Sequence, residues 1–303
     1  MKRFHLLAGM AAMLAGSGPL LAEDAAPASE REYAAVNGTT LSCPVPVPPS
    51  AEQQATQFET APRDLDELSR GAQEFFSADS EIGAAFRARQ AEMFATDWPF
   101  LCRYRDANAA LKESGKRPRA VFMGDSITEG WIVADPQFFS ENGFVDRGIS
   151  GQSSAQMVAR FQHDVVALSP GAVHIMAGTN DIGGATGPIT EEEFLGNIRA
   201  MVALARANGI EVVLAAIPPM SRLLPRPEFD TRPVVRRLNA ALAALAREQG
   251  SEFVDYYTPL AEESGDFDPA FANDGVHPTR AGYDVMEPLA RAAVEAVLEA
   301  GGQ

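Results

Sequence analysis

Hydrophobic and polar positions follow two distinct patterns along this chain, and both become regular after residue 118. Short apolar runs alternate with longer segments in which apolar side chains recur every three or four residues. The runs are typical of buried strands and the longer segments of amphipathic helices. The predicted strands are 119–123, 143–146, 172–177, 210–217 and 252–255, and the predicted helices are 152–167, 190–207, 232–249 and 279–299. This alternation predicts an α/β fold whose parallel sheet is covered by helices on both faces.

The segment 63–115 has a different pattern, because its apolar residues recur at helical spacing without intervening strands. We expect two or three helices there, interrupted near residues 77–80 and 98–99. This helical extension is expected to pack on the main domain, which spans residues 116–303. A lid over a functional site is the alternative interpretation of the same helices.

The amino end has the pattern of an export signal. Lys2 and Arg3 precede an apolar run rich in small residues, and Ala22 is a suitable cleavage position. The run is too short for a comfortable membrane anchor, so we expect residues 1–22 to be a signal peptide, with a retained anchor as the alternative. The mature protein would then be periplasmic or extracellular. Residues 23–62, rich in Ala and Pro, are expected to be a flexible linker.

Charge and cysteine content restrict the possible partners. The formal net charge is −16, and it becomes about −18 once the signal peptide is removed. Such a surface repels nucleic acid and acidic polymers. Cys43 and Cys102 are the two cysteines; an oxidising compartment permits a disulfide between them, but one pair does not establish it. Neither has a His or a second Cys at metal-binding spacing, so no metal site is expected.

Four polar blocks that contain glycine lie at the ends of predicted strands. They are Gly124-Asp125-Ser126, Gly148-Ile149-Ser150-Gly151-Gln152, Gly178-Thr179-Asn180-Asp181 and Asp274-Gly275-Val276-His277-Pro278. Loops at the carboxyl edge of a parallel sheet bind ligands in open α/β folds, so we expect the four blocks to meet there. Ser126 is the candidate nucleophile, because a turn from strand to helix would expose its hydroxyl and its backbone N–H at this edge.

A serine nucleophile needs a base, and histidine is the residue whose pKa lies nearest to working pH. The mature chain offers His163 in a predicted helix, His174 in a predicted strand and His277 in a loop. His277 is the candidate base, because Asp274, three residues earlier, can fold back onto the imidazole and fix its tautomer. The same spacing occurs by chance, and capping of the following helix by Asp274 or Thr279 is the alternative.

Ester cleavage also needs hydrogen-bond donors that are in place for the tetrahedral intermediate. The backbone N–H of Ser126 is one candidate. Gly151 can supply a second N–H, since the lack of a Cβ lets the main chain approach a ligand closely, and Asn180 can supply a side-chain amide. The alternatives are that Gly151 is only a turn glycine and that Asn180 only caps its loop.

With these four blocks the chain resembles the SGNH hydrolases, the GDSL-type esterase and lipase superfamily. The residues that match the four blocks of this family, within residues 118–295, are Ser126, Gly151, Asn180 and His277. The resemblance implies a catalytic triad of Ser126, Asp274 and His277 and an oxyanion hole formed by Ser126, Gly151 and Asn180. It also implies a flavodoxin-like three-layer α/β/α sandwich with a five-stranded parallel sheet.

The implied function is hydrolysis of short-chain, acetyl-like carboxylic esters through an acyl-enzyme on Ser126, without a metal or organic cofactor. The alternatives are a carbohydrate O-acetyl esterase of acetylxylan type and a non-catalytic glycan-binding module. For a carbohydrate substrate, Trp131 is a candidate sugar-stacking platform, with core or rim packing as the alternative. The expected partner is therefore a small ester or acetylated carbohydrate, with no nucleic acid and no stable membrane insertion. The sequence does not indicate an oligomeric state.

Overall fold

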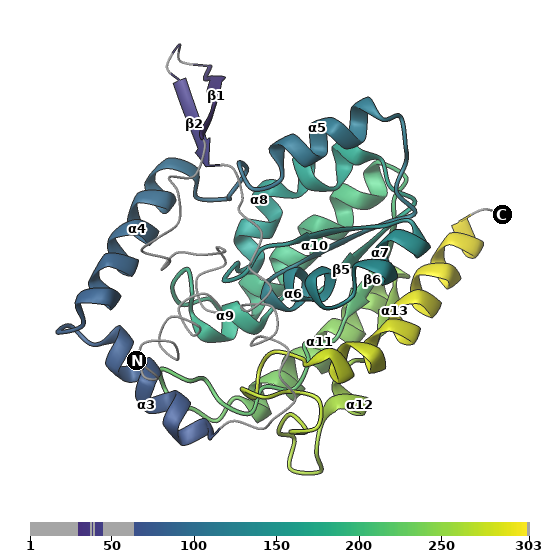
Figure 1. Ribbon diagram of the computed structural model, residues 1–303. Helices are drawn as coiled ribbons and strands as arrows, with labels where there is room; N and C mark the ends of the chain where they lie inside the picture. Colours follow the sequence, from purple (N-terminus) through teal and green to yellow (C-terminus); the bar gives the residue numbers. More distant parts are fainter. Residues whose placement is uncertain (1–29, 37, 39, 45–63, 302–303) are drawn as a thin grey trace.

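A five-stranded parallel sheet lies at the centre of the molecule in a computed structural model that describes residues 30–36, 38, 40–44 and 64–301 (Figure 1). The predicted signal peptide and the proline-rich stretch 45–49 lie outside these residues. The strands are β3 (Ala120–Gly124), β4 (Phe144–Gly148), β5 (Ala172–Ile175), β6 (Glu211–Ala215) and β7 (Glu252–Val254). Each of the five predicted strands is therefore present, within two residues or so of its expected bounds.

The strands lie in the order β4-β3-β5-β6-β7. β3, the first of them in the chain, thus has β4 on one side and β5 on the other, with Ala120 in register with Phe144 and with Ala172. This is the flavodoxin-like strand order, and the predicted fold class is confirmed. The chain leaves β3 toward one edge of the sheet and returns toward the other, so a crevice forms beyond the carboxyl end of β3.

The two faces of the sheet are both buried, which explains why the strands are continuous apolar runs. In β3, Val121 and Met123 belong to the core on one face, whereas Ala120 and Phe122 belong to the core on the other.

The first face is covered by α5 (Arg105–Glu113), α8 (Ser154–Asp164), α10 (Glu191–Ala207) and α11 (Arg232–Gln249). The second is covered by α6 (Ser126–Ala134), α7 (Pro136–Asn142), α12 (Tyr257–Leu260) and α13 (Arg280–Gly301). The remaining short elements are the 3₁₀ helix η1 (Val166–Leu168) and α9 (Thr179–Gly183).

Trp131 belongs to the second core and is fully buried. Its ring stacks on Phe138 at 5.2 Å and on Tyr283 at 5.5 Å between ring centroids. The interpretation of Trp131 as a sugar-stacking platform is therefore wrong, because a platform residue must expose a ring face. Core packing, the alternative, explains the residue.

The helical extension consists of α3 (Leu65–Phe76) and α4 (Glu81–Asp97), followed by α5 against the sandwich, and the breaks fall where the sequence predicted them (Figure 1). Asp64 and Ser80 cap the first two helices by accepting backbone N–H groups of their first turns. α3 packs on the segment after β6, where Leu68 and Leu224 share a small apolar cluster. In the described part of the chain, no helix is both long enough and apolar enough to cross a membrane.

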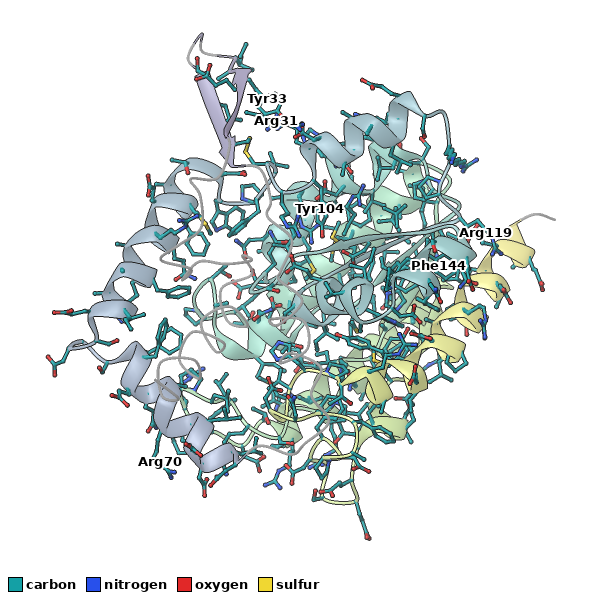
Figure 2. The ribbon with its side chains drawn as sticks, in the orientation of Figure 1. Arg31, Tyr33, Arg70, Tyr104, Arg119 and Phe144 are labelled. Carbon is teal, nitrogen blue, oxygen red and sulfur yellow. A yellow bond between two sulfur atoms is a disulfide. The ribbon has the colours of Figure 1, made fainter. Side chains whose placement is uncertain are left out.

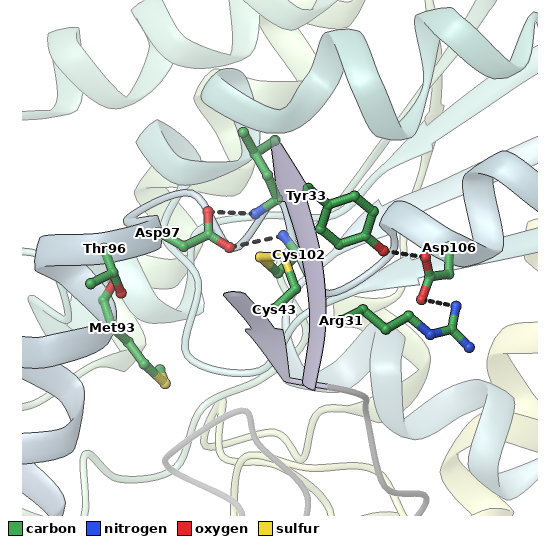
Figure 3. Close-up of a disulfide and its surroundings, with 9 residues drawn as sticks. Arg31, Tyr33, Cys43, Met93, Thr96, Asp97, Cys102 and Asp106 are labelled. Carbon is green, nitrogen blue, oxygen red and sulfur yellow. Dashed lines mark hydrogen bonds and ion pairs between the residues drawn. A yellow bond between two sulfur atoms is a disulfide. The ribbon is translucent and has the colours of Figure 1, made fainter. Parts of the chain in front are cut away.

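Part of the segment expected to be a flexible linker is a β-hairpin. β1 (Glu30–Ala34) and β2 (Thr40–Pro44) pair antiparallel, and Cys43 of β2 forms a disulfide with Cys102 (Figure 3). Tyr33 and Arg31 of β1 lie on the side of the hairpin toward α5 (Figure 2), and both contact Asp106 at the start of that helix (Figure 3). A two-stranded hairpin is marginal by itself in water. The disulfide and the polar contacts with α5 stabilise the hairpin, whose few apolar side chains cannot do so alone.

Breaking this disulfide is expected to lower the stability of the protein. The bridge closes a loop of 59 residues, and the chain-entropy model gives about 4 kcal/mol for a loop of that length. Reduction, or a Cys43→Ser/Cys102→Ser variant, should therefore lower the midpoint of thermal unfolding. The serine variant is the control for the reductant, because its midpoint should not respond to reduction. An unchanged midpoint in both cases would contradict the expectation.

Candidate active site

The four sequence blocks meet at the carboxyl edge of the sheet. Ser126 is the first residue of α6, directly after β3, and Asn180 lies in α9 after β5. Gly151 lies between β4 and α8, and His277 lies in the loop that leads to α13. Because β3 lies between β4 and β5, the blocks that follow these three strands are neighbours at the crevice where the strand order reverses.

Ser126, His277 and Asp274 form a continuous chain of contacts. Ser126 Oγ lies 2.9 Å from His277 Nε2, and His277 Nδ1 lies 2.8 Å from Asp274 Oδ2. Asp274 is 3% exposed and Ser126 is 8% exposed, so water has little access to either side chain. These distances are those of a nucleophile, a base and the residue that orients the base.

Asp274 does not cap the helix that follows, which was the alternative for this residue. Its Oδ1 accepts the backbone N–H groups of Val276 at 2.9 Å and His277 at 2.8 Å, inside the loop itself. Thr279 instead accepts the N–H of Gly282 in the first turn of α13. The loop thus wraps around the carboxylate, and Oδ2 remains directed at the imidazole.

The charges of this pair shift both pKa values. Burial lowers the pKa of His277, but the negative charge and the hydrogen bond of Asp274 outweigh burial, so the pKa of His277 is raised above its ordinary value. Burial raises the pKa of Asp274. The charge of His277, the hydrogen bond from its imidazole and the hydrogen bonds from two backbone N–H groups outweigh the effect of burial, so the pKa of Asp274 is lowered. Asp274 is therefore ionised throughout the neutral range.

The raised pKa of His277 predicts the pH dependence of any reaction that uses this imidazole as a base. A protonated imidazole cannot accept the proton of Ser126, so kcat/KM should fall as the pH is lowered through the pKa of His277 in the free protein. We expect the midpoint of this acid limb above the ordinary pKa of a histidine, in a titration of kcat/KM with a neutral ester. A midpoint at or below the ordinary value would contradict the predicted coupling to Asp274.

The predicted donors Gly151 and Asn180 follow β4 and β5, the two strands that flank β3. Gly151 has a φ of +76°, a conformation that residues with a side chain rarely adopt, so glycine is required at this turn. The amide nitrogen of Asn180 donates to the carbonyl oxygen of Gln152 at 3.1 Å and to Asp125 Oδ2 at 3.3 Å. These bonds fix the amide in the crevice between β3 and β5. To donate to an oxyanion as well, the Asn180 amide would have to share or give up one of these two hydrogen bonds.

Two carboxylates that the sequence analysis did not single out connect the blocks. Asp125 is 1% exposed, and it caps α6 by accepting the N–H of Ile127 at 3.0 Å. Burial raises the pKa of Asp125 to about 6, although the N–H of Ile127 and the charge of His277 act in the opposite direction. Asp181 accepts the N–H of Ser154 at 3.0 Å and also its hydroxyl, which joins the third block to the start of α8. Asp125 lies in the first of the four blocks and Asp181 in the third, and this position in the sequence is the feature that could have indicated them.

His163 and His174, the two other histidines among the described residues, make no contact with the site. His174 is fully buried in β5, and its Nε2 lies 2.9 Å from the hydroxyl of Tyr256. Burial lowers the pKa of His174 to about 3, so it stays neutral at working pH. His163 is exposed on α8. Among the residues that the structure describes, no group of three or more His, Cys, Asp or Glu is arranged to hold a metal ion.

Several known proteins are similar to this chain in sequence and in structure. The model of the GDSL-like lipase/acylhydrolase family matches residues 122–285. A solved structure from Bacteroides fragilis NCTC 9343, classed as an acylhydrolase, is 44% identical, covering 67% of this chain and 99% of its own with a TM-score of 0.63. A GDSL-like lipase from Bacteroides thetaiotaomicron VPI-5482 is 42% identical, covering 66% and 99%, also with a TM-score of 0.63.

A more distant structure is an acetylxylan esterase from Geobacillus stearothermophilus, which is 24% identical. The match covers 58% of this chain and 94% of that one with a TM-score of 0.50, a likeness that shows the fold alone. No curated protein matches the chain. Because the segment matched by the family model spans more than half of the chain and contains all four blocks, this protein belongs to the GDSL-like lipase/acylhydrolase family of SGNH hydrolases.

Proposed function

We propose that this protein is an exported serine esterase that cleaves short-chain, acetyl-like carboxylic esters through an acyl-enzyme on Ser126. The observation that carries the proposal is the chain of contacts from Ser126 Oγ through the imidazole of His277 to the buried carboxylate of Asp274. Burial of a carboxylate is costly unless it is hydrogen-bonded, and the partner of Asp274 here is an imidazole whose other nitrogen faces a serine hydroxyl.

In the first half-reaction, the proton of Ser126 Oγ passes to His277 Nε2 while Oγ attacks the ester carbonyl carbon. Asp274 stabilises the imidazolium that forms. The backbone N–H groups of Ser126 and Gly151 and the amide of Asn180 receive the developing oxyanion. His277 then gives the proton to the leaving alcohol, and an acyl group remains on Ser126.

In the second half-reaction, a water molecule takes the place of the alcohol. His277 removes a proton from this water, which attacks the acyl carbonyl and forms a second tetrahedral intermediate at the same donors. Collapse of this intermediate releases the carboxylic acid, and Ser126 Oγ recovers its proton from His277. The chain's own residues supply every proton transfer in this cycle.

The preference for short acyl groups is supported by the character of the described surface. The exposed large apolar side chains are scattered over separate elements: Val36, Trp98, Phe229 and Leu289. Isolated residues of this kind are ordinary on a soluble surface and do not form the broad apolar patch that a lipid interface would require. Export is supported by the disulfide between Cys43 and Cys102, since such bonds persist in oxidising compartments.

Covalent labelling and acyl-chain preference test this proposal together. Wild-type protein would be treated with a serine-directed fluorophosphonate and its intact mass measured, and hydrolysis of p-nitrophenyl acetate would be compared with that of p-nitrophenyl decanoate. One adduct per chain and a strong preference for the acetyl ester are expected. Preference for the decanoyl ester would overturn the substrate class, and absence of both adduct and turnover would overturn the activity. Acetate release from acetylated xylan in the same series distinguishes a carbohydrate substrate from a simple ester.

A further inference from the structure

The loop that carries Gly151 is held on both sides by residues outside the predicted triad and oxyanion hole. We call residues 148–152, which connect β4 to the start of α8, the oxyanion loop. Its first residue lies very close to α6: a Cβ added to Gly148 would lie 2.1 Å from the backbone nitrogen of Glu129. The loop therefore rests directly on the helix that begins with Ser126.

Glu129 is the residue of α6 that binds this loop. Its Oε2 accepts the backbone N–H of Ser150 at 2.9 Å and the Ser150 hydroxyl at 2.5 Å. Its other oxygen, Oε1, accepts a hydrogen bond from Arg103 at 2.8 Å. The Glu129 side chain is 17% exposed and the Arg103 side chain 31% exposed, so the pair is only partly open to water. One carboxylate oxygen of Glu129 thus binds the loop, and the other binds Arg103.

Gln152 holds the other side of Gly151. Its side-chain amide donates to the carbonyl oxygen of Pro99 at 3.0 Å, and its side-chain oxygen accepts from buried Arg160. The backbone oxygen of Gln152 accepts the amide of Asn180 at 3.1 Å. Gly151 therefore lies between two residues whose positions are fixed. The direction of its N–H depends on both of them.

Arg103 and Pro99 belong to the turn that connects α4 to α5. Asp97 accepts the backbone N–H groups of Leu101 and Cys102, each at 2.8 Å, and the disulfide to Cys43 lies at the same turn (Figure 3). Tyr104, the next residue after Arg103, donates its hydroxyl to Asp146 and to the carbonyl oxygen of Gly148. The extension thus contacts the oxyanion loop at its first and last residues and, through Arg103 and Glu129, at Ser150.

We propose that Glu129, held by Arg103, is a positioning residue that keeps the Gly151 N–H directed at the oxyanion. This inference rests on the proposed function, because it assigns a role within that reaction. Glu129 lies three positions after Ser126 on the same helix, so its carboxylate links the loop donor to the nucleophile. A misplacement of about 1 Å at a reacting centre can cost on the order of a hundredfold in rate.

The test compares Glu129→Gln and Glu129→Ala with wild type in hydrolysis of p-nitrophenyl acetate. An amide has one acceptor oxygen, so Gln can serve Ser150 or Arg103 but not both, whereas Ala serves neither. We expect kcat to fall in the order Glu, Gln, Ala, by about tenfold to a hundredfold for Ala. KM should stay within about threefold, because an interaction made in the transition state is lost rather than substrate binding.

Glu287→Gln is the matched control. Glu287 lies on α13 with a side chain 16% exposed and is also paired with an arginine, Arg280, at 3.7 Å. The control therefore removes a carboxylate of nearly equal exposure that also lies near an arginine, at a longer distance, and that has no contact with the oxyanion loop. Its kcat should equal that of wild type. Thermal unfolding of all variants separates a loss of kcat from a loss of folded protein.

Arg103 provides a second, independent arm of the test. If Arg103 acts through Glu129, then Arg103→Ala should lower kcat, Arg103→Lys should restore part of it, and Arg103→Ala/Glu129→Ala should be no slower than Glu129→Ala alone. Multiplicative losses in the double variant would overturn the coupling of the two residues.

The proposed function and this inference fail in different ways. Inactive wild-type protein, or turnover that survives Ser126→Ala, would overturn the proposed function. Active wild-type protein whose kcat is unchanged in Glu129→Ala, even with a lower midpoint of unfolding, would overturn the positioning role alone. A raised KM with unchanged kcat would also overturn it, since Glu129 would then act on substrate binding.

Discussion

Replacing Ser126 by alanine is expected to reduce ester hydrolysis by about 10⁴- to 10⁶-fold, the range found when the nucleophile of a serine hydrolase is removed. The change deletes one oxygen, whose partner is His277 Nε2 at 2.9 Å. The backbone N–H of residue 126 remains, so the alanine variant keeps the predicted oxyanion donors. The measurement is kcat for p-nitrophenyl acetate, together with intact mass after fluorophosphonate treatment, which should show no adduct.

The fold should not change in this variant, because alanine is a good residue for the first turn of a helix. Far-ultraviolet circular dichroism and the midpoint of thermal unfolding check this point. Ser140→Ala, which removes a hydroxyl from the neighbouring helix α7, is the matched control and should keep wild-type turnover and labelling. Near wild-type turnover in Ser126→Ala would contradict the assignment of the nucleophile.

The fold could be predicted because the local pattern and the tertiary structure agree. Val121 and Phe122 are adjacent apolar residues that point to opposite cores, and a run of this kind is what a strand buried on both faces requires. The site residues could be predicted for a related reason: the first three blocks come directly after β3, β4 and β5, and parallel strands bring their carboxyl ends together. The fourth block comes later after β7 and was found by the spacing of Asp274 and His277.

The Glu129 contacts could not be predicted, because they depend on distances in space between residues far apart in the chain. On a helical pattern Glu129 is an ordinary charged position, and Arg103 lies in a separate segment whose docking the pattern does not determine. Local sequence contains the triad spacing, since Asp274 and His277 are three residues apart. Local sequence contains no such signal for the Glu129 carboxylate, which joins Arg103 to Ser150.

The hairpin was missed for a different physical reason. Its strands are short, and only part of their surface faces apolar neighbours, so periodicity gave no strand signal. What orders them is the bond from Cys43 to Cys102 and the contacts of Tyr33 and Arg31 with Asp106. A cysteine pair in the sequence allows such a bridge without establishing it, because the distance between the two residues is a property of the fold.

Replacing Asp274 by asparagine is the second change with a large expected effect, a fall in kcat of about 10⁴-fold. Asp274 Oδ1 accepts two backbone N–H groups, so the asparagine oxygen must stay there and its NH₂ group must face His277 Nδ1. That NH₂ group can only donate. The neutral imidazole would then carry its proton on Nε2, the nitrogen that faces Ser126, and could not accept the serine proton.

Asp274→Asn has a second, independent expected effect, on the pH dependence of the reaction. The charge of Asp274 is what raises the pKa of His277 against the effect of burial, so Asp274→Asn should also move the acid limb of kcat/KM to lower pH. The matched control is Asp255→Asn, since Asp255 accepts the N–H and the hydroxyl of Thr258, likewise three residues later, but at α12. The control should keep the kcat and the acid limb of wild type. If Asp274→Asn lowered kcat without moving the limb, the carboxylate would orient the imidazole but would not stabilise its charged form, and one of the two roles assigned to Asp274 would be wrong.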